Sequence, residues 1–268
     1  MTPSLEILIP LKKRKSINKT ILSLLEIKQI NLITILSGDK KSIIEPKIAH
    51  NSKIRIINLS QYPFCKTFYL NHGIKNSPSD ILLISDADII WNQNTITNIY
   101  QTINNNLDSP LIVHIQEVQE TNNHTNALKR PRLTPVINKT IDKIQIDIIT
   151  ELSTSKRSGC GLICATKNNL LSLGGYNEHL RGWGWEDQDL LIRANILGYE
   201  VKSMGAVLHQ SHGDEIRNPS QESPIFTRNR NIAISNQMIL AYQLHGSLRQ
   251  EIVTLPQHIT ITGFDQRI

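Results

Sequence analysis

The chain has 268 residues, of which 39% are hydrophobic and 19% charged, and its formal net charge is +6 at pH 7. At this length, apolar residues in patterned runs indicate one large α/β domain or two intimately packed halves, and they exclude a disordered chain. The positive charge suits an anionic small molecule such as a nucleotide diphosphate, or an anionic membrane face, although a mildly basic protein without such a partner has the same charge.

The three cysteines, Cys65, Cys160 and Cys164, indicate neither a disulfide framework nor a zinc site. Their number is odd, and the single C-x3-C spacing has no partner pair. The first ten residues lack the basic-then-apolar pattern of a signal peptide, and no segment approaches the ~20 apolar residues of a membrane helix. We therefore expect free thiols in a reducing cytosol and a cytoplasmic protein, with association at the inner face of the cell membrane left open.

The apolar residues of the first half recur with periods that predict alternating strands and helices. A strand, a helix and a strand of these lengths form a βαβ unit, so we expect a parallel sheet with right-handed crossovers. The predicted elements are a strand at 5–10, a helix at 16–27, strands at 31–37 and 53–59, a helix at 64–76, a strand at 81–84, a helix at 92–107 and a strand at 111–118.

The second half begins with a long polar segment at 120–132, which we interpret as a loop that is either functional, such as a lid, or simply surface. No internal repeat or low-complexity linker divides the chain. The predicted elements that follow are a strand at 161–166, a helix at 167–173, a turn at 174–177, a helix at 189–197, a strand at 201–208, a helix from about 219 to 244 and a strand-like stretch at 252–261.

Four cations, Lys12, Lys13, Arg14 and Lys15, directly follow the first predicted strand, and Asp39 closes the next one. The cations would lie at the carboxyl end of the parallel sheet, where α/β folds bind their ligands. A run of charges is also common on a solvated face, so this cluster indicates a ligand site only together with other groups.

Asp86 and Asp88 follow the strongly apolar strand at 81–84. In an extended chain their side chains would point to one side, where like charges repel unless a cation is present. Divalent ions such as Mg2+ and Mn2+ bind carboxylate oxygens and phosphates together, so the pair is a candidate metal site. The alternative is a turn after the strand with aspartates that cap the helix at 92–107.

Two of the three tryptophans, Trp183 and Trp185, alternate with glycines in the segment 181–189, and acids follow them. A flexible, aromatic and acidic segment suits a wall that binds sugars, because indole faces cover C–H groups and carboxylates bind hydroxyls. The glycines would also allow the segment to move as a lid over a ligand. The alternative is a helix start, at which Glu186 and Asp187 simply favour the positive end of the helix.

His209 and His212 follow the strand predicted at 201–208. Two histidines three positions apart at the end of a strand are candidate metal ligands. A lone histidine is more often a structural residue with satisfied hydrogen bonds. A ligand role for either histidine therefore depends on Asp88 lying near it.

Together these segments resemble the inverting β-1,4-galactosyltransferases and the related bacterial capsule and chondroitin-type polymerases, which have the GT-A fold. His209 falls where that family has its metal-binding histidine. The match spans about residues 5 to 212, and its last block is the most specific part. The segments that carry the resemblance are I-P-L-K-K-R at 9–14, F-C-K-T-F-Y-L-N-H-G at 64–73, S-D-A-D at 85–88, and the block from L-G-G-Y at 173–176 to G-W-G-W-E-D at 182–187.

The resemblance implies an α/β fold of the GT-A type in one continuous catalytic domain at 1–215. A Rossmann-like nucleotide-sugar-binding half with a mostly parallel central sheet would cover 1–110, and an acceptor-binding, catalytic half would cover 111–215. Residues 216–268 would form a helical and strand extension packed on this domain. The donor would be a UDP-sugar and the cofactor Mn2+ or Mg2+.

The resemblance also implies roles for single residues. Asp187 would be the general base, and Asp88 and His209 would ligate the metal together with the donor diphosphate. The acceptor would be bound by Trp183, Trp185 and Glu186. The donor would be bound by Pro10, Leu11, Lys12, Arg14, Asp39, Lys66, Asn71, Asp86 and Trp183.

Three positions depart from the family pattern. Lys12 and Lys66 stand in place of arginines, which removes bidentate binding of phosphate and alters the contacts with the donor. Trp185 stands in place of a usual glycine, so we expect a reshaped acceptor pocket.

We therefore expect a metal-dependent inverting glycosyltransferase that moves a hexose or N-acetylhexosamine from a UDP-sugar to a hydroxyl of a glycan or lipid-linked oligosaccharide, in bacterial cell-surface polysaccharide or lipooligosaccharide synthesis. A nucleotidyltransferase is one alternative, although it would have a glycine-rich phosphate loop where this chain has lysines. A non-catalytic sugar-binding module is another, and it predicts no Mn2+-dependent binding of UDP. No nucleic-acid partner is expected, whereas peripheral membrane association and a homo-oligomer stay open.

Overall fold

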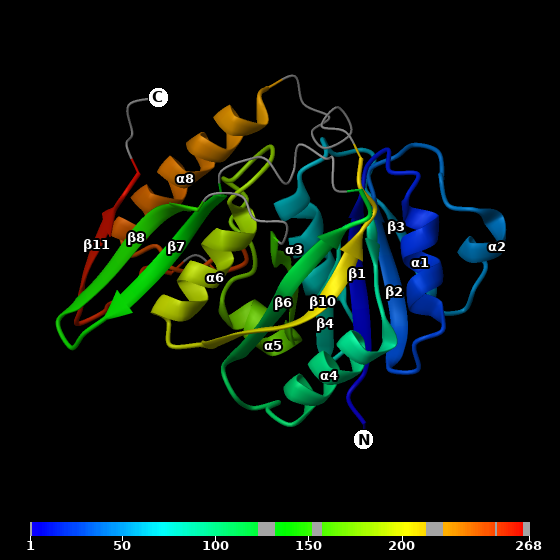
Figure 1. Ribbon diagram of the computed structural model, residues 1–268, viewed down its shortest axis with the longest axis horizontal. Helices are drawn as coiled ribbons and strands as arrows, with labels where there is room; N and C mark the ends of the chain where they lie inside the picture. The colour runs from blue at the N-terminus through cyan, green and yellow to red at the C-terminus, as the bar shows by residue number, and fades with distance from the viewer. Residues whose placement is uncertain (1, 123–131, 152–156, 213–221, 250, 265–268) are drawn as a thin grey trace.

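The computed structural model describes residues 2–122, 132–151, 157–212, 222–249 and 251–264. Its strands form one large and one small sheet, which lie side by side in Figure 1. In spatial order the large sheet consists of β3 (Ile54–Asn58), β2 (Ile30–Ser37), β1 (Leu5–Leu11), β4 (Ile81–Ile84), β9 (Arg157–Thr166), β6 (Leu111–Glu120), β10 (Glu200–His209) and β5 (Ile89–Ile90). The small sheet consists of β11 (His258–Thr262), β8 (Lys143–Glu151) and β7 (Arg132–Lys139).

The helices confirm most of the sequence prediction, and the short α2 is the one not foreseen. The last helix was predicted to begin at about 219, but α8 begins at Pro224, and residues 219–221 lie outside the described part of the chain. The helices are α1 (Ile17–Leu25), α2 (Pro46–Ala49), α3 (Lys66–Asn76), α4 (Gln93–Asn104), α5 (Lys167–Ser172), α6 (Glu186–Ile196) and α8 (Pro224–Leu240). Within the described ranges, no helix is both long and apolar enough to cross a membrane.

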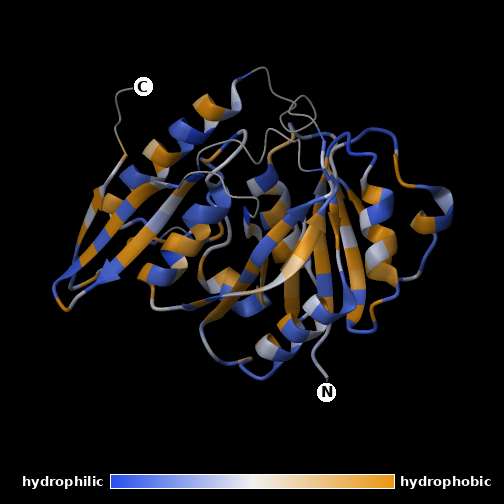
Figure 2. Cartoon of the chain, viewed as in Figure 1, coloured by the Kyte–Doolittle hydropathy of each residue, from blue (hydrophilic) through white to orange (hydrophobic). Residues whose placement is uncertain are grey.

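The core of the large sheet follows from the composition of its central strands. Every residue of β1 is buried, because helices cover both faces of the sheet. On one face Ile7 and Ile9 pack with residues of α1 and α4, and on the other face Leu8 packs with residues of α3 and α6. Figure 2 shows this pattern as strands that are mainly apolar, flanked by helices with one apolar and one polar side.

The strand directions bring the ends of β1, β2 and β4 to one edge of the sheet. β1 pairs in parallel with both β2 and β4, and β2 pairs in parallel with β3, as the predicted βαβ unit requires. β9 lies between β4 and β6 and is antiparallel to both, which the sequence did not indicate. The fold is therefore α/β with a mainly parallel central sheet, and the predicted fold class is confirmed.

Two strands of the small sheet, β7 and β8, come from a stretch, 132–151, in which no strands were predicted. β7 and β8 form an antiparallel hairpin, and β11 adds in parallel to β8. The alternation of Ile144, Ile146 and Ile148 with polar residues in β8 was the available signal, since it is the period of a half-buried strand. These isoleucines pack against α6 and α8 in a third apolar cluster.

Three boundary predictions need correction or stay open. The strand expected at 252–261 is the shorter β11. The polar loop expected at 120–132 falls mainly on 123–131, which lie outside the described residues. The boundary expected between 215 and 216 lies outside them as well, so the division into domains stays a prediction.

Arg193 of α6 links three segments through a side chain that is only 1% exposed. Its Nε donates to Asp189 Oδ2 at 2.8 Å, and its terminal nitrogens donate to the carbonyls of Leu173, Gly175 and Leu244. The other oxygen of Asp189 accepts a hydrogen bond from Ser235 of α8 at 2.7 Å. This buried network joins α6 to the turn after α5 and to the C-terminal segment.

Replacing Arg193 by methionine should lower the free energy of unfolding by about 3–5 kcal/mol, because Asp189 would stay buried without its charged partner. Urea denaturation followed by circular dichroism measures the change. The matched control is Arg249→Met, since the Arg249–Glu251 pair is equally short at 2.8 Å but 44% and 58% exposed, and should matter little. Equal losses in the two variants would contradict the role given to burial.

Candidate active site

A cleft of about 940 Å3 lies at the carboxyl edge of the large sheet and is bounded by β9, the segment 181–188 and residues of α8. Most of the residues that the sequence singled out meet here, although they come from distant parts of the chain. Those that line the cleft are Pro10, Lys12, Arg14, Lys66, Asp86, Asp88, Trp183, Trp185, Glu186, Asp187, His209 and His212.

Lys66, the first residue of α3, lies among three carboxylates of this cleft. Its Nζ is 2.9 Å from Asp187 Oδ2, 3.3 Å from Glu186 Oε1 and 3.5 Å from Asp86 Oδ1. Burial by itself would lower the pKa of the Lys66 ammonium, but the three carboxylates raise that pKa well above its usual value. Lys66 therefore provides a permanent positive charge beside Asp187.

Asp187 lies in the first turn of α6 with a side chain that is 14% exposed. Its Oδ2 accepts a hydrogen bond from Lys66, whereas its buried Oδ1 has no hydrogen-bond partner among the described residues. Burial raises the pKa of the Asp187 carboxyl to about 7, with Lys66 opposing and Glu186 and Asp86 reinforcing the change. A carboxylate with this pKa and an unpartnered oxygen suits a general base near neutral pH.

Gly161 of β9 provides the space that the Asp187 carboxylate occupies. A Cβ atom at position 161 would lie 2.6 Å from Asp187 Oδ2, which is closer than these atoms can approach. The sequence prediction treated Gly161 only as the start of a strand. A glycine inside a strand often marks close approach of another group, so this residue was the available signal for the contact.

Asp88, His209 and His212 form a second cluster, in which one ligand atom from each residue lies within 4.8 Å of the other two. His209 Nε2 is 3.5 Å from Asp88 Oδ1, and His212 Nε2 is 3.1 Å from Asp88 Oδ2. Burial opposes ionisation of Asp88, but hydrogen bonds from both histidines and the charge of Arg14 hold the pKa of its carboxyl well below the usual range. The structure thus brings both candidate histidines to Asp88.

His209 is oriented by Glu120, a residue with a buried side chain that the sequence prediction missed. His209 Nδ1 is 2.6 Å from Glu120 Oε2, and Arg157 Nε donates to Glu120 Oε1 at 2.9 Å. With Nδ1 held by this carboxylate, Nε2 faces Asp88, which is the arrangement that metal-binding histidines commonly have. The residues meet because β6 and β10 pair in parallel, with His209 opposite Glu120.

His212 has a competing partner. Its Nε2 is 2.9 Å from Nη1 of Arg14, which in turn is 3.8 Å from Asp88 Oδ2. Arginine can only donate, so the same nitrogen of His212 lies between a donor, Arg14, and the carboxylate of Asp88. His209 is therefore the better placed metal ligand of the two.

Asp86 and Asp88 do not share a partner, contrary to the expectation from an extended chain. The chain turns after Ile84, so that Asp86 faces Lys66 while Asp88 faces the histidines. The alternative that these aspartates cap the following helix is wrong as well. Asn92 caps α4, and its side chain accepts a hydrogen bond from the backbone N–H of Thr95.

Three residues expected to bind a donor do not line the cleft. Leu11 is buried in the core between the sheet and α1. Asn71 is buried as well, and its amide bonds both the backbone N–H and the carbonyl of Tyr176, so it fixes a turn and has no contact with the cleft. Asp39 accepts a hydrogen bond from the backbone N–H of Lys13 at 2.9 Å and thereby supports the turn after β1.

The two tryptophans of the segment 181–189 have different positions. Trp183 is half-buried at the wall of the cleft. Trp185 is 5% exposed and packs in the third apolar cluster against Ile192 and Ile232, although it also borders the cleft. The helix-start interpretation is also correct, since α6 begins at Glu186 with its acids in the first turn.

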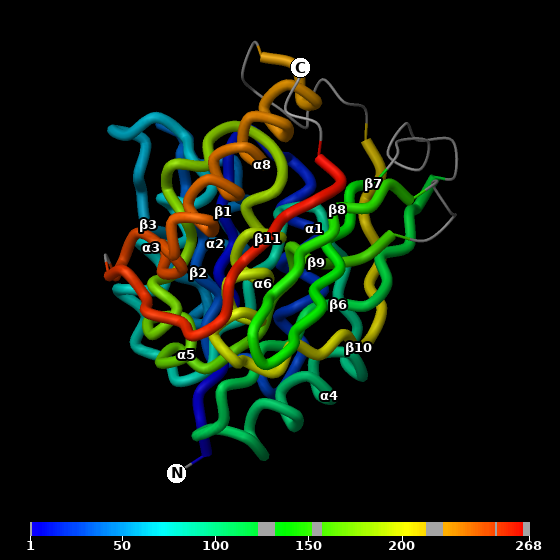
Figure 3. The backbone as a smooth tube through the Cα atoms, turned by 90° about the vertical axis from the view of Figure 1, so that its left-hand side faces the viewer, coloured from blue at the N-terminus to red at the C-terminus, as the bar shows by residue number. Residues whose placement is uncertain are grey.

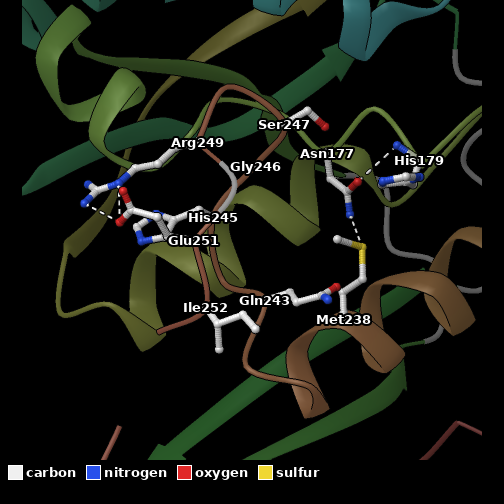
Figure 4. A pocket seen from close by; sticks show the side chains of 10 residues that line it. All are labelled: Asn177, His179, Met238, Gln243, His245, Gly246, Ser247, Arg249, Glu251 and Ile252. Carbon is white, nitrogen blue, oxygen red and sulfur yellow. Dashed lines mark hydrogen bonds and ion pairs between the residues drawn. The ribbon is translucent and has the colours of Figure 1, made fainter. Parts of the chain in front are cut away.

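A smaller pocket of about 300 Å3 lies between the turn at 177–179 and the C-terminal segment (Figure 4). Glu251, the one acidic residue among those that line it, is already paired with Arg249 at 2.8 Å. The residues around this pocket include no paired carboxylates and no metal-binding set. The larger cleft is therefore the candidate active site.

Comparison with solved structures supports the GT-A fold. The structure titled GalNAc-T7 with UDP, GalNAc and Mn2+ is 13% identical, and the match covers 90% of this chain and 48% of that chain at a TM-score of 0.64. The structure of TarS from S. aureus is 12% identical, with coverage of 89% and 44% and a TM-score of 0.54. The chain thus spans about half the length of these proteins, and at such identities the likeness shows the fold alone.

No curated protein sequence matches the chain significantly. The finer resemblance to β-1,4-galactosyltransferases stays a prediction. A family model described as "Glycosyltransferase like family 2" matches residues 6–221. The matched range includes Lys66, Asp187 and Asp88, together with the residues that contact them in the cleft. Because this match covers most of the chain, the protein belongs to the glycosyltransferase family 2-like proteins.

Proposed function

We propose that the chain is a metal-dependent inverting glycosyltransferase that moves a hexose or N-acetylhexosamine from a UDP-sugar to a hydroxyl of a glycan acceptor. Family membership supports the transfer of a sugar. The observation that carries the finer proposal is the pairing of two clusters in one cleft, a nearly buried Asp187 beside Lys66 and the Asp88–His209–His212 set.

The cations of the cleft suit the diphosphate of a nucleotide-sugar. Lys12 and Arg14 follow β1, and Lys66 begins α3, so three positive charges lie near the carboxyl edge of the sheet. A diphosphate there would compete with Asp187 for Lys66 and would leave the carboxylate available as a base. Because lysine is a flexible point charge, this site would bind phosphate without the fixed bidentate geometry of arginine.

The residues around Asp88 suit a divalent ion. One carboxylate and two imidazoles supply oxygen and nitrogen ligands within 4.8 Å of each other, and Glu120 fixes the ring of His209. Mn2+, or Mg2+, held by Asp88 and His209 would compensate the negative charge of the departing diphosphate. The presence of UDP and Mn2+ in the similar GalNAc-T7 structure supports this assignment.

The transfer itself needs one base. Asp187 would take the proton of the acceptor hydroxyl while the hydroxyl oxygen bonds to the anomeric carbon and the bond from that carbon to the diphosphate oxygen breaks. Attack from the face opposite the leaving group inverts the anomeric configuration. Trp183 would cover the sugars and Glu186 would bind acceptor hydroxyls, and the resemblance favours a cell-surface polysaccharide or lipid-linked oligosaccharide as acceptor.

Asp187→Asn should lower the rate of sugar transfer by roughly 10²–10⁴-fold, because the base is lost while the shape of the side chain is kept. UDP affinity should not fall, since the change releases Lys66 from its closest partner. The rate of sugar transfer is measured as UDP release in the presence of a saccharide acceptor, with the UDP-sugar that most stabilises the protein as donor. The affinity for UDP is measured by calorimetry. Asp142→Asn, at an exposed site between β7 and β8, is the control; full activity of Asp187→Asn would refute the assignment.

The transfer rate at saturating Mn2+ should rise with pH through a midpoint near 7. Asp187 works as a base only when ionised, and its raised pKa of about 7 leaves it protonated at lower pH. Glu186→Gln removes a neighbouring negative charge, so it should move the midpoint to lower pH. A pH profile of kcat/KM for both proteins tests this, and a midpoint that Glu186→Gln leaves in place would argue against Asp187 as the titrating group.

His209→Ala should weaken Mn2+ binding more than His212→Ala, because His212 Nε2 is engaged by Arg14. Glu120→Gln should weaken it by roughly 10–100-fold through loss of the orienting carboxylate. Electron paramagnetic resonance of free Mn2+ measures these affinities without any assay of activity. His258→Ala in β11 is the control, since His258 is exposed, and an unchanged affinity in His209→Ala would identify another ligand set.

A further inference from the structure

Helix α8 lies beyond the part of the chain that the family model matches, which ends at 221. It packs against α6 and β11, so that it covers the start of the helix that carries Asp187 (Figures 1 and 3). The cleft itself is bordered by side chains of its first turns. Its contacts with the segment 181–189 indicate what this helix does for the site.

One face of α8 carries a polar stripe that is buried. Thr227, Asn231 and Ser235 recur every four residues and are no more than 1% exposed. Residues four apart lie above one another on a helix, so the three side chains point in one direction. Burying such groups is costly unless they form hydrogen bonds, and each of the three side chains forms at least one hydrogen bond to the segment 181–189.

Two residues of the stripe hold the backbone of the loop at Trp183. Thr227 Oγ1 accepts from the N–H of Trp183 at 3.3 Å and lies 3.0 Å from its carbonyl oxygen, to which it can donate. Asn231 Nδ2 donates to the carbonyl of Gly184 at 2.8 Å. Arg230, beside the stripe, donates to the carbonyl of Arg181 at 3.1 Å.

The third residue of the stripe anchors α6. Ser235 donates to Asp189 Oδ1 at 2.7 Å, and Asp189 also accepts from the buried Arg193. Asp189 lies within the same first turn as Glu186 and Asp187, so this bond fixes the orientation of that turn. α8 therefore contacts both the loop that precedes the base and the helix that carries it.

The loop requires such support because its backbone is strained at Trp185. Gly182 and Gly184 have φ angles of 82° and 97°, which glycine adopts readily, but the φ angle of 78° at Trp185 is unfavourable for a residue with a side chain. A strained backbone persists only where its surroundings determine it. At Gly182 a Cβ atom would lie 2.8 Å from Thr227 Cγ2, so α8 also leaves no space for a side chain there.

We propose that α8 is a positioning helix for the active site, with Thr227 and Asn231 as positioning residues that set Trp183 at the wall of the cleft. The loop at 181–185 is then a preset wall whose conformation depends on the C-terminal segment. A movement of this loop as a lid would first have to break its bonds to α8. The effect on catalysis rests on the proposed function, whereas the effect on Trp183 does not.

The structural test uses protein labelled with 5-fluorotryptophan, whose three residues give separate 19F resonances that Trp→Phe variants assign. Thr227→Val removes the hydroxyl at similar volume, so the resonance of Trp183 should shift or broaden, and Thr227→Ser should restore it. Trp91 is the internal reference, because it is buried in the core beside α1 and bonds Ser85. Gln237→Ala, on the exposed face of α8, should change none of the resonances.

The catalytic test compares the same variants in sugar transfer and in UDP binding. Thr227→Val should lower kcat/KM by about tenfold to a hundredfold through misplacement of the wall, with recovery in Thr227→Ser and no loss of UDP affinity. An unchanged Trp183 resonance in Thr227→Val would overturn the proposal whatever the activity, and so would a changed resonance with unchanged kcat/KM. A changed resonance in a protein whose wild type transfers no sugar would instead refute the proposed function and leave the structural role of α8 in place.

Discussion

The site depends on the contact between Lys66 and the carboxylates of Asp187, Glu186 and Asp86. Asp187 and Glu186 are nearly buried, whereas the side chain of Asp86 is 41% exposed. The three acids would repel each other, and the lysine ammonium at 2.9, 3.3 and 3.5 Å compensates for this repulsion. The compensation is incomplete, because burial still raises the pKa of Asp187. The balance leaves a carboxylate that can hold or release a proton near neutral pH, next to the cation of Lys66.

Lys66, Asp86, Glu186 and Asp187 come from different elements, each of which positions one part of the contact. The parallel strands bring Asp86 and the lysine helix α3 to one edge of the large sheet. β9, which runs antiparallel through the middle of the sheet, presents Gly161 where the Asp187 carboxylate needs space. On the opposite side, α6, α8 and the small sheet form a separate apolar cluster that holds the helix carrying Asp187 against the cleft. The cleft therefore lies where this cluster meets the core of the large sheet.

The positions of the candidate metal ligands depend on the pairing of strands β6 and β10. His209 and Glu120 are far apart in the sequence and adjacent only because β10 pairs in register with β6. That pairing gives His209 a fixed ring, with one nitrogen on Glu120 and the other toward Asp88. His212 lies beyond the end of the strand, and its Nε2 faces both Arg14 and Asp88. The different surroundings of the two histidines thus follow from strand register.

The sequence by itself determined the alternating strands and helices, since their apolar periods are local, and it determined which side chains follow the ends of strands. Asp86, Asp88 and His209 were found in this way, whereas Asp187 was found from the aromatic and acidic segment at 181–189 and from the family resemblance. The tertiary structure decided which polar residues face the cleft and which serve the fold. Asn71, in a segment that carries the family resemblance, is buried in α3 and bonds the backbone of Tyr176. Gly161, Glu120 and the polar stripe of α8, in contrast, support the site. The physical reason is that burial and hydrogen-bond partners depend on residues distant in the chain, about which local patterns carry no information.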